Sequence, residues 1–166
     1  MIWEALQGIG ALVGLVTGAF VFYEHLTRHS PVAYVIAKPL VAGGSGRVLF
    51  LRVENPSVWP IFIRWPSGIT KNEFRIGRDS STRGVIEALI DGKRVGVVDG
   101  KSVRDFVLLL PNNFDGMSMD GMIETAVRWR FAQTRLWKPD RKMHVRMTKE
   151  DVVFLQDERP NLDFES

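Results

Sequence analysis

The sequence predicts a mainly β fold: an Ig-like antiparallel β-sandwich with one or two short helices, preceded by a single N-terminal transmembrane helix. Two observations support this prediction. An uncharged apolar run lies near the N-terminus, and after position 31 short β-branched and aromatic runs alternate with turn residues. We expect residues 1–30 to form the transmembrane helix and its exit turn, residues 31–156 the sandwich, and residues 157–166 a polar tail.

The first expected element is the apolar run over residues 5–23, which contains no charged residue and lies between Glu4 and Glu24. At about 1.5 Å per residue a helix over this run is about 28 Å long, close to the roughly 30 Å hydrocarbon core of a bilayer. The alternatives are a buried or interfacial helix and a cleaved signal peptide. An interfacial helix usually has a charged face, and a signal peptide has a basic start, so we predict a helix that spans the membrane.

Small residues recur along one face of this expected helix. Residues four apart share a helix face, and a face without side chains lets a second helix approach closely in lipid. Glycine is also common in transmembrane helices without such a role. The regular spacing nevertheless favours helix–helix packing, with a second copy or another membrane protein, through Gln7, Gly10, Gly14, Thr17 and Gly18.

The charges beside the apolar run predict its orientation. Neither Lys nor Arg precedes the run, whereas Arg28 and Lys38 follow it. The positive-inside rule therefore places the large domain in the cytoplasm. We expect a single-pass protein of the cell inner membrane, whose layout of a short anchor and a compact β domain resembles small accessory envelope proteins of bacteria.

The expected strands of the soluble part are short apolar runs bounded by turn residues. Their spacing favours an all-β sandwich over alternating strands and helices. In chain order they cover residues 32–37, 47–54, 60–65, 71–76, 94–98, 101–110, 123–133 and 142–147.

Two short helices are expected among these strands. Residues 79–81 can cap a helix, and apolar residues then recur with helical spacing as far as residue 90. Thr148 and Asp151 resemble a capping box in front of a second apolar run at residues 152–155. We expect the first helix, over residues 81–90, to pack over one end of the sandwich.

The segment 128–149 carries most of the positive charge. It has eight basic residues and one acid, Asp140, so its net charge is +7, and because the whole chain is +3 the remainder is −4. We consider three interpretations: the solvated face of an edge hairpin, contact with anionic lipid headgroups, and contact with nucleic acid. The candidate anion-binding residues are Arg128, Arg130, Arg135, Lys138, Arg141, Lys142 and Arg146.

The sequence contains no recognisable catalytic motif. It has no cysteine, which excludes thiol nucleophiles and thiolate metal sites. His25 and His29 have metal-ligand spacing but lack the glutamate of a metalloprotease motif, and His144 stands alone. We therefore expect a non-catalytic interaction module without cofactor or metal, acting in a membrane-associated assembly or in regulation. Its partners would be the lipid bilayer and a neighbouring helix, and a membrane-tethered nucleic-acid-binding domain is the alternative.

Overall fold

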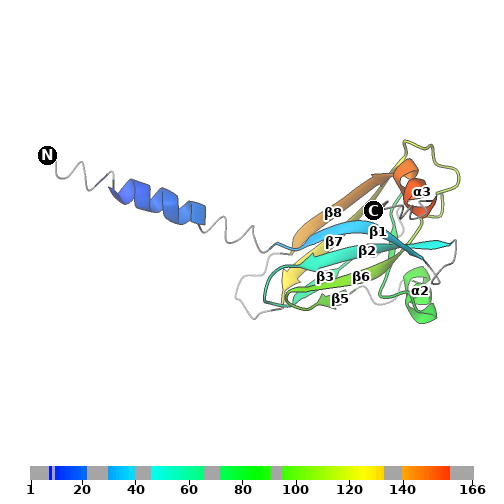
Figure 1. Ribbon diagram of the computed structural model, residues 1–166, viewed down its shortest axis with the longest axis horizontal. Helices are drawn as coiled ribbons and strands as arrows, with labels where there is room; N and C mark the ends of the chain where they lie inside the picture. Colours follow the sequence, from blue (N-terminus) through cyan, green and yellow to red (C-terminus); the bar gives the residue numbers. More distant parts are fainter. Residues whose placement is uncertain are drawn as a thin grey trace, which may run out of the picture.

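The computed structural model of the protein contains two four-stranded antiparallel sheets, consistent with a β-sandwich, and three short helices among the residues that it describes (Figure 1). The structure describes residues 8, 10–21, 30–39, 46–65, 72–90, 95–132 and 140–157. The mainly β class predicted from the sequence is therefore confirmed. The expected tail lies outside the described residues from residue 158 onward.

Each sheet combines strands that are distant in the sequence. The first sheet has the order β1-β2-β6-β4, with β1 at Val32–Pro39, β2 at Arg47–Asn55, β6 at Ser102–Leu109 and β4 at Arg75–Gly77. The second has the order β5-β3-β7-β8, with β5 at Val95–Val98, β3 at Ile61–Arg64, β7 at Met122–Phe131 and β8 at Arg141–Thr148. All of these strands lie within or beside the predicted runs, although β4 is shorter than expected.

The core lies between the two sheets, and the long strands β2 and β7 each bury every second residue against it. Along β7, Val127 and Trp129 are buried, whereas Arg128 and Arg130 point to the outer face and are exposed. Phe106 of β6 is fully buried and meets Trp65 edge to face, with ring centroids 5.5 Å apart. The remaining buried apolar residues come from both sheets, so the predicted two-layer arrangement is confirmed.

The turn at residues 99–101 carries the chain from one sheet to the other. β5 pairs with β3 in the second sheet, whereas β6 pairs with β2 in the first. Lys101 adopts a positive φ of 50°, a left-handed conformation suited to a tight reversal. The turn thus separates two of the expected strands, and these strands lie in different layers.

Both expected helices of the domain form, and both are capped as predicted. In α2, at Thr82–Leu89, the Ser81 hydroxyl accepts a hydrogen bond from the Gly84 amide at 3.0 Å. In α3, at Lys149–Asp157, the Thr148 hydroxyl accepts from the Asp151 amide at 3.1 Å, while the Asp151 carboxylate accepts from the Thr148 amide at 2.9 Å. This carboxylate has a lowered pKa because the Thr148 backbone and side chain both donate to it.

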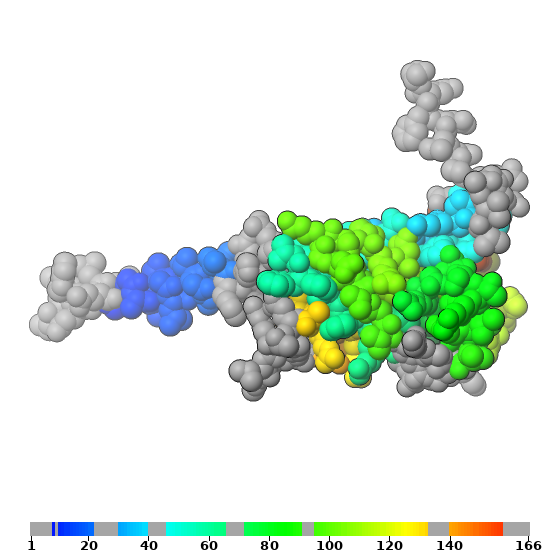
Figure 2. Space-filling model, turned by 90° about the horizontal axis from the view of Figure 1, so that it is seen from below, coloured from blue at the N-terminus to red at the C-terminus, as the bar shows by residue number. Residues whose placement is uncertain are grey.

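Residues 10–21 are helical and lie apart from the sandwich (Figures 1 and 2). Within the described ranges, no helix combines the length and the apolar character needed to cross a bilayer. The predicted span covers residues 5–23, and its residues 5–7, 9, 22 and 23 lie outside the described part of the chain. Gln7 of the expected packing face is among them.

Candidate functional site

Three cations from three adjacent strands lie side by side on the outer face of the second sheet. The antiparallel register places Arg128 of β7 directly opposite Arg64 of β3 on one side and opposite Lys142 of β8 on the other. All three side chains are exposed, and none forms an ion pair with any residue that the structure describes. We call Arg64, Arg128 and Lys142 the basic row.

Like charges directly opposite each other on neighbouring strands destabilise a sheet. The basic row contains two such pairs, Arg64 with Arg128 and Arg128 with Lys142. An anion bound beside the row would relieve this repulsion. The arrangement is therefore suited to binding negative charge, and it is unfavourable when the face is unoccupied.

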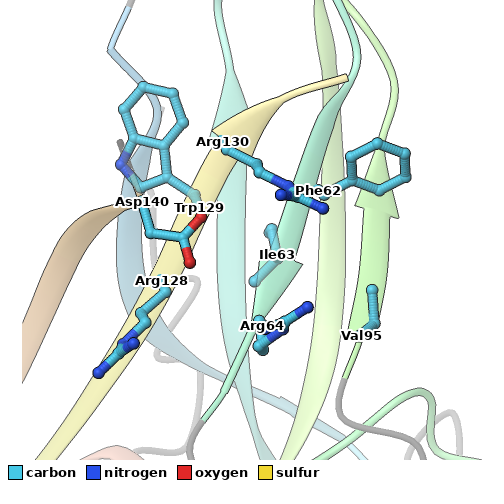
Figure 3. A pocket seen from close by; sticks show the side chains of 8 residues that line it. All are labelled: Phe62, Ile63, Arg64, Val95, Arg128, Trp129, Arg130 and Asp140. Atoms are coloured by element: carbon cyan, nitrogen blue, oxygen red, sulfur yellow. The ribbon is translucent and has the colours of Figure 1, made fainter. Parts of the chain in front are cut away.

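Arg130 extends the positive charge along β7. Its register partner is Phe62 of β3, and its guanidinium lies over the Phe62 ring, 5.9 Å from the centroid. Figure 3 shows the Arg130 side chain directed toward Phe62. Stacking on the ring holds the guanidinium at the surface, where it keeps its charge and its hydrogen-bond donors.

A shallow hollow lies between these side chains. Its volume is about 170 Å³, well above the roughly 10–15 Å³ that one ordered water molecule requires. Three guanidinium groups and one carboxylate, that of Asp140, contribute its charge. The lining residues are Phe62, Ile63, Arg64, Val95, Arg128, Trp129, Arg130 and Asp140 (Figure 3).

At the other end of the same face, Arg146 is neutralised within the protein. The Glu124 carboxylate lies 3.1 Å from Arg146 Nη2 and 3.1 Å from His144 Nδ1. The hydrogen bond from Arg146, followed by that from His144, lowers the pKa of Glu124. The positive charge without a partner is therefore concentrated toward the Phe131 end of β7.

That end of the sandwich is also where the chain arrives from the N-terminal helical residues. Val32, the first residue of β1, pairs with Glu54 near the end of β2. The chain then enters β3 at Ile61, which pairs with Phe131 at the end of β7. We call this the proximal end, and the opposite end, where α2 and α3 lie, the distal end (Figure 1).

The structure brings together part of the predicted anion-binding set. Arg128, Arg130, Lys142 and Arg146 share the outer face of the second sheet, although Arg146 is paired with Glu124. Arg141 pairs in register with Trp129, so it belongs to the opposite side of β8, where its guanidinium lies 5.3 Å from the Trp129 ring centroid. The two remaining candidates, Arg135 and Lys138, lie outside the described residues.

Sequence reasoning missed Arg64 and Phe62, which lie on β3. The alternation along β3 could have identified them. Ile61 and Ile63 are buried, and because successive side chains of a strand point to opposite faces, Phe62 and Arg64 must face outward. What the sequence did not contain was the pairing of β3 with β7, which places Arg64 beside Arg128.

The predicted glycine face has no partner within the described chain. A Cβ atom added to Gly10, Gly14 or Gly18 would meet nothing within 4 Å, and Thr17 is exposed. The face is thus open to a second helix. Among the described residues, no group of His, Asp or Glu side chains is placed to hold a metal ion.

The chain matches no protein-family model and no curated protein sequence.

Proposed function

We propose that the protein is a non-catalytic, single-pass membrane protein with an Ig-like interaction module, which acts in a membrane-associated assembly. Its N-terminal helix anchors the chain, and the proximal end of its β-sandwich contacts anionic lipid headgroups. The single observation that carries this proposal is the position of the basic row and Arg130 toward the end of the sandwich that receives the chain from an apolar helix.

The exposure of the helical residues supports the anchor. Leu12, Leu15 and Phe20 keep 66%, 73% and 65% of their surface exposed. Contiguous apolar surface of this kind is unfavourable in water, and burial in hydrocarbon removes that cost. The uncharged run over residues 5–23 provides the length that a span requires.

The charge of the domain supports contact with the membrane that holds the anchor. Cations near the surface of an anionic leaflet contribute about 1 kcal/mol each, and the cytoplasmic leaflet is the anionic one. A cytoplasmic domain is also the orientation that Arg28 and Lys38 favour. We infer that the anchor and the basic row act on the same leaflet.

The open glycine face supports assembly through the helix. Gly10, Gly14 and Gly18 form a surface on which another backbone can lie closely, and Thr17 beside them can hydrogen-bond across the contact. The partner is a second copy of the chain or a different membrane protein.

Nucleic acid fits this surface less well than lipid does. Proteins that bind single strands present aromatic rings on which bases stack. Trp129 faces the core, and the Phe62 ring is already covered by Arg130, so neither of these two rings is open for stacking.

Two measurements on the full chain test the proposal. Membranes that contain the protein are washed with high salt and with alkaline carbonate, and the anchored chain is expected to stay in the pellet until detergent is added. The chain is then reconstituted into nanodiscs and titrated with single- and double-stranded DNA across a salt series. Recovery of intact protein in the soluble fraction would refute the anchor, and retention of DNA at moderate salt without any preference for anionic lipid would favour the nucleic-acid alternative.

A further inference from the structure

We propose that Val58 and Trp59, in the loop between β2 and β3, insert into the headgroup region of the bilayer that holds the anchor. This contact is separate from the basic row and rests on the proposed anchor. It makes the proximal end of the sandwich a two-part membrane-binding surface, with cations on the outer sheet face and an apolar loop at the tip.

The loop presents its apolar side chains to solvent at the proximal end. It runs from Asn55, the last residue of β2, to Ile61, the first residue of β3. Val58 is 58% exposed and Trp59 is 51% exposed. Tryptophan is among the side chains most typical of the lipid–water interface, because its ring is amphipathic.

A buried hydrogen-bond network holds the loop in this conformation. Asn55 is 1% exposed, and its Nδ2 donates to the carbonyl oxygens of Trp59 at 2.8 Å and of Asp99 at 2.9 Å. Its Oδ1 accepts from the amide of Ser57 at 3.2 Å and from the hydroxyl of Ser57 at 2.7 Å. The backbone of the loop is thus fixed from inside, while the side chains of Val58 and Trp59 remain outside.

The neighbouring turn supports the loop from a second side. The Lys101 amide donates to the Ser57 carbonyl at 2.7 Å. Gly100 lies so close that a Cβ atom at this position would overlap the Val58 carbonyl. Because both segments are ordered before any contact with lipid, insertion of the loop costs little conformational entropy.

The short segment between the N-terminal helix and β1 indicates that the partner of this loop is the bilayer. From residue 21 to Val32 the chain can extend at most about 40 Å, so the proximal end stays close to the bilayer in which the anchor lies. This tether raises the local concentration of the loop at the membrane. The cations of the basic row and Lys101, which is exposed in the adjacent turn, complement an anionic headgroup layer around the inserted side chains.

The absence of cysteine from the sequence allows a site-specific test in the full chain. Val58→Cys, labelled with an environment-sensitive NBD dye, reports on the loop. Ile86→Cys is a matched control, because Ile86 is also a β-branched residue, is 48% exposed and lies on α2 at the distal end. Val13→Cys, in the N-terminal helix, reports on the anchor. Each variant is reconstituted into liposomes that contain phosphatidylglycerol and doxyl-labelled quencher lipids.

We expect lipid quenching at positions 58 and 13 and none at position 86. Adding Trp59→Ala to Val58→Cys should remove most of the quenching at position 58, whereas Trp59→Phe should retain part of it. Quenching at position 13 without quenching at position 58 would overturn the loop insertion and leave the anchor intact. The absence of quenching at position 13 would instead refute the anchor. Equal quenching at positions 58 and 86 would show non-specific adhesion of the domain and would also overturn the proposal.

Discussion

Replacing Arg128 by Gln should stabilise the unbound domain. Arg128 lies between Arg64 and Lys142, so the substitution removes two like-charge pairs from the sheet. Cross-strand pairs contribute on the order of 0.2–1 kcal/mol each, and the repulsion between exposed charges lies toward the lower part of that range. The expected gain in the free energy of unfolding is therefore about 0.5 kcal/mol, and the melting temperature should rise by about 1–3 °C.

The same substitution should weaken contact with anionic lipid. A cation near such a surface contributes on the order of 1 kcal/mol, which corresponds to about a fivefold change in an equilibrium constant. The full chain is reconstituted into nanodiscs with phosphatidylglycerol, and the docked fraction of the domain is measured by energy transfer to a lipid fluorophore. Arg128→Gln should lower the docking equilibrium about fivefold at low salt, and the difference should shrink as salt increases because screening reduces the attraction.

Arg83→Gln is the matched control. Arg83 carries the same charge, its side chain is 84% exposed, and it lies on α2 at the distal end, where it pairs with Glu87. This variant should leave docking unchanged. The reasoning is refuted if Arg128→Gln lowers the melting temperature, or if both variants weaken docking to the same extent.

Three further predictions concern other parts of the structure. Asp105 accepts hydrogen bonds from Arg52, which lower the pKa of its carboxyl below that of the unfolded chain. The Asp105 carboxylate therefore stabilises the fold above its unfolded pKa of about 3.9, and this stabilisation is lost as the pH falls through its folded pKa. In Asp105→Asn the free energy of unfolding should consequently depend less on pH below about pH 4. Asn55→Leu should destabilise the domain by about 2–4 kcal/mol in denaturant titrations, because the carbonyls of Trp59 and Asp99 lose their buried donor. Gly14→Ile should reduce the oligomer size in detergent by blocking the glycine face, and an unchanged size would count against helix pairing.

The sequence is sufficient to predict structure that depends on residues close together in the chain. The alternation of Val127, Arg128, Trp129 and Arg130 predicts both the strand and its two faces, and β7 has this arrangement. Thr148 and Asp151 are three residues apart, and their reciprocal capping depends only on that spacing. A strand's two faces and a helix cap each depend on residues only a few positions apart, so the sequence alone can predict them.

The sequence was not sufficient where strand pairing decides the outcome. β5 and β6 are joined by a short turn, yet they lie in different sheets, and nothing in residues 99–101 specifies this. The basic row likewise depends on the register between β3 and β7, whose residues are far apart in the chain. Arg141 is close in sequence to the other cations, yet its position opposite Trp129 places it on the other side of β8.

The two ends of the sandwich differ in how the charges on the outer face of the second sheet are satisfied. Toward the distal end, Arg146 and His144 share the Glu124 carboxylate, and both helices have capped N-termini. Toward the proximal end, the cations of the basic row form no ion pair with a described residue. There the buried Asn55 fixes the backbone of a loop whose Trp59 side chain is exposed. A domain selected only for stability and solubility would mix its charges and cover its large apolar side chains. Exposed apolar side chains also occur at the distal end, among them Ile90 and Phe154. At the proximal end an exposed apolar loop lies near cations that form no ion pair with a described residue, and a single anionic bilayer surface would satisfy both kinds.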